Sequence, residues 1–195
     1  MKVIGINGSP RKKSNTRFLL EKSLEKVKIK AIDIEIFDVQ NILKTLKNPF
    51  CIHCSSPCNQ SCYLETELEY KLKELSRADG IIIASPVYFG SVTAQLKAFW
   101  DKTRHIRSEL KLIGKPGAAI AIGGSQYGGQ ETTIRTIHDM MLIQGMTIVG
   151  NGVKGFNAGH QGSCARQPVF ENQQYIKDAE NMGTRIADEV ISRNR

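Results

Sequence analysis

The chain has 195 residues, of which 41% are hydrophobic, and a formal net charge of +8 at neutral pH. This length suits one globular domain with its own core, so we expect a single domain over residues 1–195. The basic charge fits an acidic partner, an anionic ligand or a solvated surface. Because Lys and Arg are scattered, without an arginine-rich tract or zinc-finger pattern, the sequence disfavours nucleic-acid binding.

Membrane insertion and export are not indicated either. No apolar run approaches the roughly 20 residues of a membrane span. Met1-Lys2 leads directly into Val3-Ile-Gly-Ile6, without the long apolar region of an export signal. We therefore expect a soluble, cytoplasmic protein.

Apolar runs of strand length alternate with amphipathic stretches of helix length. We expect strands at 2–7, 33–38, 79–85, 117–122 and 146–149, and helices at 16–28, 65–76, 92–107, 131–145 and 171–193. The nearly continuous apolar run at 79–85 is typical of a central parallel strand, whereas the alternation at 33–38 favours an edge strand. This order predicts an α/β fold with a doubly wound five-stranded parallel sheet and helices on both faces.

Three polar loops rich in glycine follow strand ends, at 8–16, 85–92 and 123–130. Doubly wound sheets bind ligands at this edge, beyond the carboxyl ends of their strands. A fourth loop, 150–168, is long and nearly free of large apolar side chains, which favours a functional or disordered segment.

The first loop, Asn7-Gly-Ser-Pro-Arg-Lys-Lys-Ser-Asn-Thr16, places hydroxyl, amide, cationic and backbone N–H groups beside a predicted helix N-terminus. Such a helix end favours phosphate. The glycine patterns of nucleoside triphosphate and dinucleotide sites are both absent, so a phosphomonoester fits better. With no ligand, Ser14 or Asn15 would simply cap the helix. The candidate phosphate ligands are Ser9, Arg11, Ser14, Asn15 and Thr16.

The second and third loops offer surfaces for a planar ring. In the second loop a proline fixes the backbone and a glycine permits close approach, although aromatic residues at strand ends also belong to hydrophobic cores. The third loop is either a further wall of the site or a flexible surface loop. The candidate ring contacts are Pro86, Val87, Tyr88, Phe89 and Gly90 in the second loop, and Ser125, Tyr127, Gly128 and Gly129 in the third.

Four of the five cysteines fall within twelve positions, at Cys51, Cys54, Cys58 and Cys62. Thiolates select iron-sulfur clusters or zinc, and this spacing differs from the bacterial ferredoxin run by one residue in the second gap. Clustered cysteines without an export signal favour metal or redox chemistry over disulfides. The residues alone leave open a [4Fe-4S] cluster, zinc or a redox dithiol, and free thiols. Cys164 stands apart, and we expect an ordinary free thiol there.

Together these motifs resemble the iron-sulfur flavoproteins, a branch of the flavodoxin-like NAD(P)H-dependent FMN reductases. The resemblance spans nearly the whole chain and lies in four segments: Gly8–Arg11 with Ser14–Thr16, the cysteine-rich segment 48–64, Ala84–Gly90, and Gly128–Thr132. It implies a flavodoxin-like fold with the cysteine-rich segment inserted after the second strand. It also implies two cofactors, FMN and a [4Fe-4S] cluster.

The resemblance further assigns roles to the candidate residues. The residues of the first loop would hold the FMN phosphate, Pro86 to Gly90 would line the isoalloxazine ring, and the four clustered cysteines would ligate the cluster. The family more often has two residues between the second and third cysteines and a longer gap before the fourth. No side chain is assigned as a catalytic acid or base, because the core reaction is electron transfer.

Members of this family pass electrons between a low-potential donor such as ferredoxin and acceptors that include oxygen and peroxide. They assemble as homodimers or homotetramers, and we expect a partner subunit to bring cluster and flavin together. Two other functions remain open. One is an NAD(P)H-dependent FMN or quinone reductase with a structural or zinc-bound cysteine segment. The other is a non-enzymatic binding module for an acidic partner.

Overall fold

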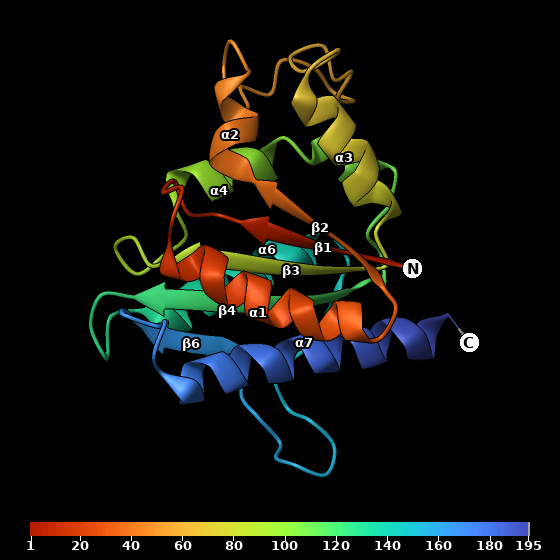
Figure 1. Cartoon of the computed structure of the whole chain (residues 1–195). Coiled ribbons are helices and arrows are strands. Elements are labelled where there is room, and N and C mark those ends of the chain that lie inside the picture. The colour runs from red at the N-terminus through yellow and green to blue at the C-terminus, as the bar shows by residue number, and fades with distance from the viewer. Residues whose placement is uncertain (195) are drawn as a thin grey trace.

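The computed structural model describes residues 1–194, which form one parallel sheet with helices on both faces (Figure 1). The strand order is β2-β1-β3-β4-β5, with β6 also paired to β4. The predicted doubly wound parallel sheet is confirmed, and this order is that of flavodoxin-like folds. The strands are β1 (Lys2–Asn7), β2 (Asp33–Asp38), β3 (Gly80–Pro86), β4 (Pro116–Gly123), β5 (Thr147–Ile148) and β6 (Ser163–Arg166).

Burial along the strands follows their place in the sheet. In β3 and β4 every residue is buried except Pro86, because helices cover both faces of the central strands. In β2 only Phe37 is buried, and β2 lies at the edge of the sheet as its alternation predicts.

Two hydrophobic clusters lie on opposite faces of the sheet. One face is covered by α1 (Asn15–Ile29) and α7 (Gln173–Arg193), which lie side by side in Figure 1. The other face is covered by helices that share the second cluster. These are α2 (Val39–Lys44), α3 (Glu67–Arg77), α4 (Ala94–Asp101), α5 (Arg104–Ser108) and α6 (Gln130–Ile143).

The fifth strand position is filled by two short strands. β5 pairs with Pro116 and Gly117 of β4, the chain then leaves the sheet, and β6 returns to pair with residues 120–123 of the same strand. The expectation that residues 150–168 lack regular structure was therefore wrong for β6. Its sequence, Ser-Cys-Ala-Arg, has no β-branched or aromatic residue, so pairing with β4 defines it as a strand.

The predicted helix at 92–107 is divided into α4 and α5. Around the break, Thr103 Oγ1 donates to the carbonyl of Trp100 at 2.7 Å and accepts from Gln144 Nε2 at 2.6 Å. Thr103 is 1% exposed, so α6 and the break are joined by a buried hydrogen bond. The short helix α2, which the sequence analysis did not predict, follows β2 and buries Val39, Ile42 and Leu43.

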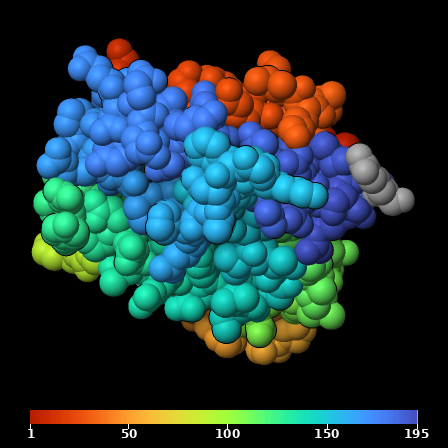
Figure 2. All heavy atoms as spheres, turned by 90° about the horizontal axis from the view of Figure 1, so that it is seen from below, coloured from red at the N-terminus to blue at the C-terminus, as the bar shows by residue number. Residues whose placement is uncertain are grey.

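The cysteine-rich segment lies between α2 and α3, after the second strand as predicted, and beyond the β2 edge of the sheet in Figure 1. Residues 150–162 project beside α7 and occupy the middle of the surface in Figure 2. Within residues 1–194, no helix combines the length and apolar character needed to span a membrane.

Candidate functional site

A cavity of about 260 Å³ opens at the carboxyl ends of β1, β3 and β4, the edge at which doubly wound sheets bind ligands. It brings together eight of the predicted ligand contacts: Ser9, Arg11, Ser14, Asn15, Thr16, Pro86, Val87 and Tyr88. It is also lined by residues that the sequence analysis did not select, namely Lys13, Ile122, Gly123, Gly124, Gln167 and Phe170. The cavity therefore draws on four separate stretches of the chain.

One end of this cavity is the N-terminus of α1. Ser14 is the N-cap, and its Oγ accepts a hydrogen bond from the Arg17 backbone N–H at 3.0 Å. The backbone N–H groups of Asn15 and Thr16 donate to no other group of the described residues. No acidic residue lies in the first helical turn. This end therefore presents free N–H donors and the positive end of the helix dipole to an anion.

Hydrogen bonds to the side chains of Asn7 and Ser9 fix the conformation of the loop before α1. Asn7 Oδ1 accepts from the Ser9 backbone N–H at 3.1 Å, and Asn7 Nδ2 donates to Asp38 Oδ1 at 2.7 Å. Asp38 also forms an ion pair with Arg17. Ser9 is only 4% exposed, and its Oγ accepts from the Arg11 backbone N–H at 3.3 Å. Asn7, which lies outside the predicted site, therefore fixes the loop that lines the cavity.

A segment near the C-terminus closes the same cavity. Asn15 Oδ1 accepts from the Val169 backbone N–H at 3.1 Å, and the rings of Phe18 and Phe170 pack edge to face with centroids 5.0 Å apart. These contacts place Gln167 and Phe170 in the cavity wall. Their positions follow from contacts more than 150 residues apart in the chain, which local sequence patterns do not reveal.

The other end of the cavity is formed by Pro86 to Tyr88. Tyr88 and Ser91 exchange backbone hydrogen bonds of 2.9 and 3.1 Å, which close a tight turn. Phe89 and Gly90, at the centre of this turn, both have positive φ angles, of 51° and 75°. That backbone is costly for Phe89, whose side chain is fully exposed. Neither Phe89 nor Gly90 lines this cavity, so the contact expected between them and a ring stays a prediction.

The loop after β4 contributes less to this cavity than expected. Gln130 is nearly buried, and its Nε2 donates to the carbonyls of Ser125 at 2.7 Å and Ala165 at 3.3 Å. A Cβ atom at Gly123 would lie 2.4 Å from that Nε2, so a larger residue there would displace the Gln130 amide from its hydrogen bonds. Gly123 and Gly124 line the cavity, whereas Ser125, Tyr127, Gly128 and Gly129 do not.

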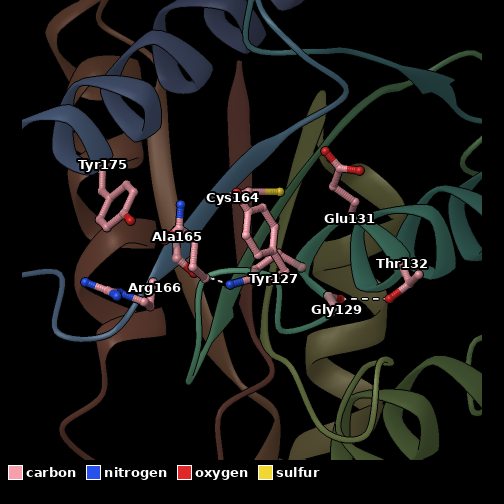
Figure 3. Close-up of a pocket in the computed structure, with 10 residues that line it drawn as sticks. Tyr127, Gly129, Glu131, Thr132, Cys164, Ala165, Arg166 and Tyr175 are labelled. Carbon is pink, nitrogen blue, oxygen red and sulfur yellow. Dashed lines mark hydrogen bonds between the residues drawn. The ribbon is translucent and has the colours of Figure 1, made fainter.

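Tyr127 and Gly129 line a second cavity of about 390 Å³ (Figure 3). In Figure 3, Tyr175 and Arg166 lie on one side and Glu131 and Thr132 on the other. Tyr127 is 96% exposed, so its ring is not packed into either cavity. The loop after β4 thus lies between two cavities, and the sequence does not indicate which of its residues line each cavity.

Cys164 lies in the wall of this second cavity. Burial raises the pKa of its thiol to about 11, and the nearby Glu131 and Asp178 carboxylates act in the same direction. At neutral pH the thiol is therefore protonated and a poor nucleophile or metal ligand. This environment agrees with the free thiol expected from the sequence.

The four clustered cysteines line a third cavity, of about 230 Å³. Cys51 and Cys58 are half-buried, and Cys54 and Cys62 are exposed. Among residues 1–194 no three Cys, His, Asp or Glu side chains already stand in a metal-binding arrangement. The donor type nevertheless suits a soft metal centre, because all four cysteines line one cavity and thiolates prefer soft metals. The residues present therefore fit an iron-sulfur cluster.

Two cationic side chains lie in the wall of the same cavity. Lys102 is 2% exposed, and its Nζ donates to the Asn48 carbonyl at 3.0 Å and to Cys62 Sγ at 3.4 Å. Arg104 donates from NH2 to the Ser55 carbonyl at 3.2 Å. The sequence analysis did not select these residues. Lys102 follows directly after α4 and Arg104 is the first residue of α5, and the packing of α4 against α2 brings both to the cysteine-rich segment.

The chain matches the NADPH-dependent FMN reductase family over residues 1–161. It is 39% identical over 193 residues to an iron-sulfur flavoprotein of Methanocaldococcus jannaschii, covering 97% of each chain. It is 34% identical over 199 residues to the iron-sulfur flavoprotein of Methanosarcina thermophila, covering 100% of this chain and 99% of the relative. A WrbA-like flavodoxin of Agrobacterium tumefaciens shares the fold, with a TM-score of 0.69 at 16% identity over 98% and 97% of the two chains.

Proposed function

The chain belongs to the iron-sulfur flavoproteins of the NADPH-dependent FMN reductase family, and from this we propose that it carries electrons between two cofactor sites of its own. It is an FMN-dependent oxidoreductase. FMN would occupy the cavity at the carboxyl ends of the strands, and a [4Fe-4S] cluster the cavity lined by cysteines. The observation that carries the proposal is that four cysteines line one cavity, separate from the one beside the α1 N-terminus.

The FMN phosphate would be bound by the first loop and the start of α1. Arg11 and Lys13 supply positive charge, Ser9 and Ser14 supply hydroxyls, and the α1 N-terminus supplies backbone N–H donors. Charge-assisted hydrogen bonds to phosphate are among the stronger polar contacts. The ring system would lie against Pro86 to Tyr88 and against the backbone of Gly123 and Gly124, where no side chain intervenes.

When bound, FMN exchanges one or two electrons and an iron-sulfur cluster exchanges one, so the pair couples one-electron and two-electron chemistry. The chain's own residues would fix the positions of both groups and control access to them. The donor we propose is a low-potential carrier such as ferredoxin, and the acceptor is oxygen or peroxide. No acid or base from the protein is assigned.

The two cavities have no lining residue in common. The cysteine-rich segment lies beyond the β2 edge of the sheet (Figure 1), whereas the cavity proposed for FMN is lined by residues at the carboxyl ends of β1, β3 and β4. We propose a homodimer or homotetramer in which the cysteine segment of one subunit approaches the FMN of another. A monomer in solution that still passes electrons from cluster to FMN would contradict this arrangement.

The second candidate is a reductase that takes hydride from NAD(P)H, with zinc or no metal at the cysteines. The match to the NADPH-dependent FMN reductase family favours it. Rapid reduction of bound FMN by NADH or NADPH in iron-free protein would support this candidate. Reduction by ferredoxin that depends on bound iron would support the electron-transfer proposal.

The deciding experiment is anaerobic purification followed by measurement of FMN, iron, acid-labile sulfide and zinc per chain. The proposal expects one FMN with about four iron and four sulfide. FMN with zinc, or with no metal after anaerobic reconstitution with iron and sulfide, would contradict it. A parallel preparation in which Cys51, Cys54, Cys58 and Cys62 are all replaced by Ser should retain FMN and lose iron.

A further inference from the structure

Lys102 is a buried cation without a carboxylate partner. It caps the C-terminus of α4, and among residues 1–194 no carboxylate oxygen lies within 4.0 Å of its Nζ. Its hydrogen-bond partners are the Asn48 carbonyl and Cys62 Sγ. An ammonium group loses hydration on burial, and that loss is offset well only by a negative partner. Of these two partners, the Asn48 carbonyl is neutral, whereas Cys62 would supply a negative charge as a thiolate ligand of the proposed cluster.

Arg104 adds a second positive charge to the same wall of the cavity. Nearby, Lys97 is an exposed lysine of α4 that pairs with Asp101 at 2.6 Å. Lys97 thus pairs with a carboxylate, as surface lysines often do. Lys102 differs because it is buried and its partners are a carbonyl and a cysteine sulfur. The wall of the cysteine cavity also contains one carboxylate, Asp101, and this carboxylate is paired with Lys97. Lys102 and Arg104 therefore leave the wall with an excess of positive charge, which favours negative charge in the cavity.

We propose that Lys102 sets the reduction potential of the cluster by donating a hydrogen bond to the Cys62 thiolate. The inference rests on the proposed function, because it requires a cluster on the four cysteines. Four thiolate ligands bring four negative charges, and reduction adds one electron more. A buried positive charge, and a hydrogen bond to a ligating sulfur, both stabilise the reduced form more than the oxidised form. Lys102 therefore raises the potential.

The test compares cluster potentials in variants of the whole protein. Lys102→Met removes the charge and the donor at similar length, and Lys102→Arg keeps both. Lys28→Met is the control, because it removes an exposed lysine of α1 that does not line the cysteine cavity. Each protein is reconstituted anaerobically with iron and sulfide, and the reduced cluster is followed by electron paramagnetic resonance in a redox titration. Iron, sulfide and FMN are quantified for each sample.

In Lys102→Met we expect the equilibrium constant for one-electron reduction to fall about tenfold, which is about 59 mV. Lys102→Arg and Lys28→Met should stay within about twofold of the wild type. If Lys102→Met does not retain iron, Lys102→Gln replaces it, because Gln keeps an N–H donor without the charge. Lys102→Gln should lower the equilibrium constant for one-electron reduction by about threefold, because only the charge is lost.

Two results would overturn the inference in distinguishable ways. An unchanged potential in fully loaded Lys102→Met, or in Lys102→Gln where that variant is used, would overturn the role of Lys102 alone. A wild-type protein that never assembles iron and sulfide would overturn the proposed function, and the inference with it.

Discussion

The side-chain oxygen of Asn15 accepts a hydrogen bond from the Val169 backbone N–H at 3.1 Å. This contact ties the first residue of α1 to a segment 154 positions later in the chain, and both lie at the same cavity. Val169 is fully buried, so its N–H has no access to water as a substitute partner. Asn15 is therefore a structural residue as well as a candidate phosphate ligand.

Replacing Asn15 in two ways should separate these roles. Asn15→Ala leaves the Val169 N–H without a partner, and the free energy of unfolding of FMN-free protein should fall by about 1–2 kcal/mol. Asn15→Asp keeps the acceptor and suits a helix N-terminus, so stability should change by less than about 0.5 kcal/mol. The added charge should nevertheless weaken FMN binding about tenfold, because it faces the phosphate.

Urea denaturation of FMN-free protein and fluorescence titration with FMN would measure these two effects. Equal stability of Asn15→Ala and wild type would contradict the structural role. Unchanged FMN affinity in Asn15→Asp would contradict the placement of the phosphate at the start of α1.

Substitutions in the first loop, residues 8–16, offer a direct test of the proposed FMN site. Arg11→Ala and Ser14→Ala should each raise the dissociation constant for FMN about tenfold, since each removes a donor from the phosphate end of the cavity. Lys12→Ala is the matched control, because Lys12 is exposed in the same loop but does not line the cavity. Iron content should be the same in all three variants, and a parallel loss of iron and FMN would argue against separate sites.

The fifth cysteine supplies a control for the cluster. Cys58→Ser should lose most of the bound iron while FMN remains, because Cys58 is one of four sulfurs at one cavity. Cys164→Ser should keep both cofactors, because Cys164 lies at a different cavity and its pKa of about 11 keeps the thiol protonated. Iron and FMN are quantified after anaerobic reconstitution. Iron loss in Cys164→Ser, or its retention in Cys58→Ser, would reverse this assignment.

Stability should depend on pH through Glu35, which bonds Lys2 at 2.6 Å and Lys71 at 2.8 Å. Burial opposes ionisation of Glu35, but the hydrogen bonds from the two lysines prevail and lower its pKa below the ordinary value. A depressed folded-state pKa contributes stability above the unfolded-state pKa of roughly 4.3, and that contribution is lost as pH falls through the folded-state value.

Glu35→Gln should therefore destabilise the protein by about 1 kcal/mol at pH 7, with the difference disappearing under acid conditions. Glu25→Gln, at an exposed pair with Lys22, should have little effect at either pH. Urea denaturation at both pH values gives the comparison. A Glu35→Gln deficit that persists at acid pH would show that packing, and not charge, is responsible.

The relatives narrow the functions that the sequence left open. Membership of a family of FMN-dependent oxidoreductases confirms the predicted family and argues against a non-enzymatic binding module. The individual site residues, the donor and the acceptor stay predictions until the experiments above are made.

Local patterns were sufficient for the five predicted strand positions and for the place of the cysteine-rich segment after the second strand, but not for α2, β6 or the break between α4 and α5. The phosphate-binding role of the first loop stays a prediction. Periodic burial, helix capping and cysteine spacing depend on residues close together in the chain, so the sequence itself determines them. The edge position of β2 could likewise be predicted, because alternation reports how many faces of a strand are covered.

Tertiary structure alone decided which side chains meet at each cavity. Gln167 reaches the cavity proposed for FMN, and Tyr127 lies at the second cavity on the other side of its loop, because of contacts between distant segments. Lys102 has no local feature that separates it from Lys97, yet the turn after α4 buries one beside Cys62 and leaves the other exposed. The direction of a side chain depends on its packing against residues that are distant in the sequence. Local sequence patterns therefore do not predict it.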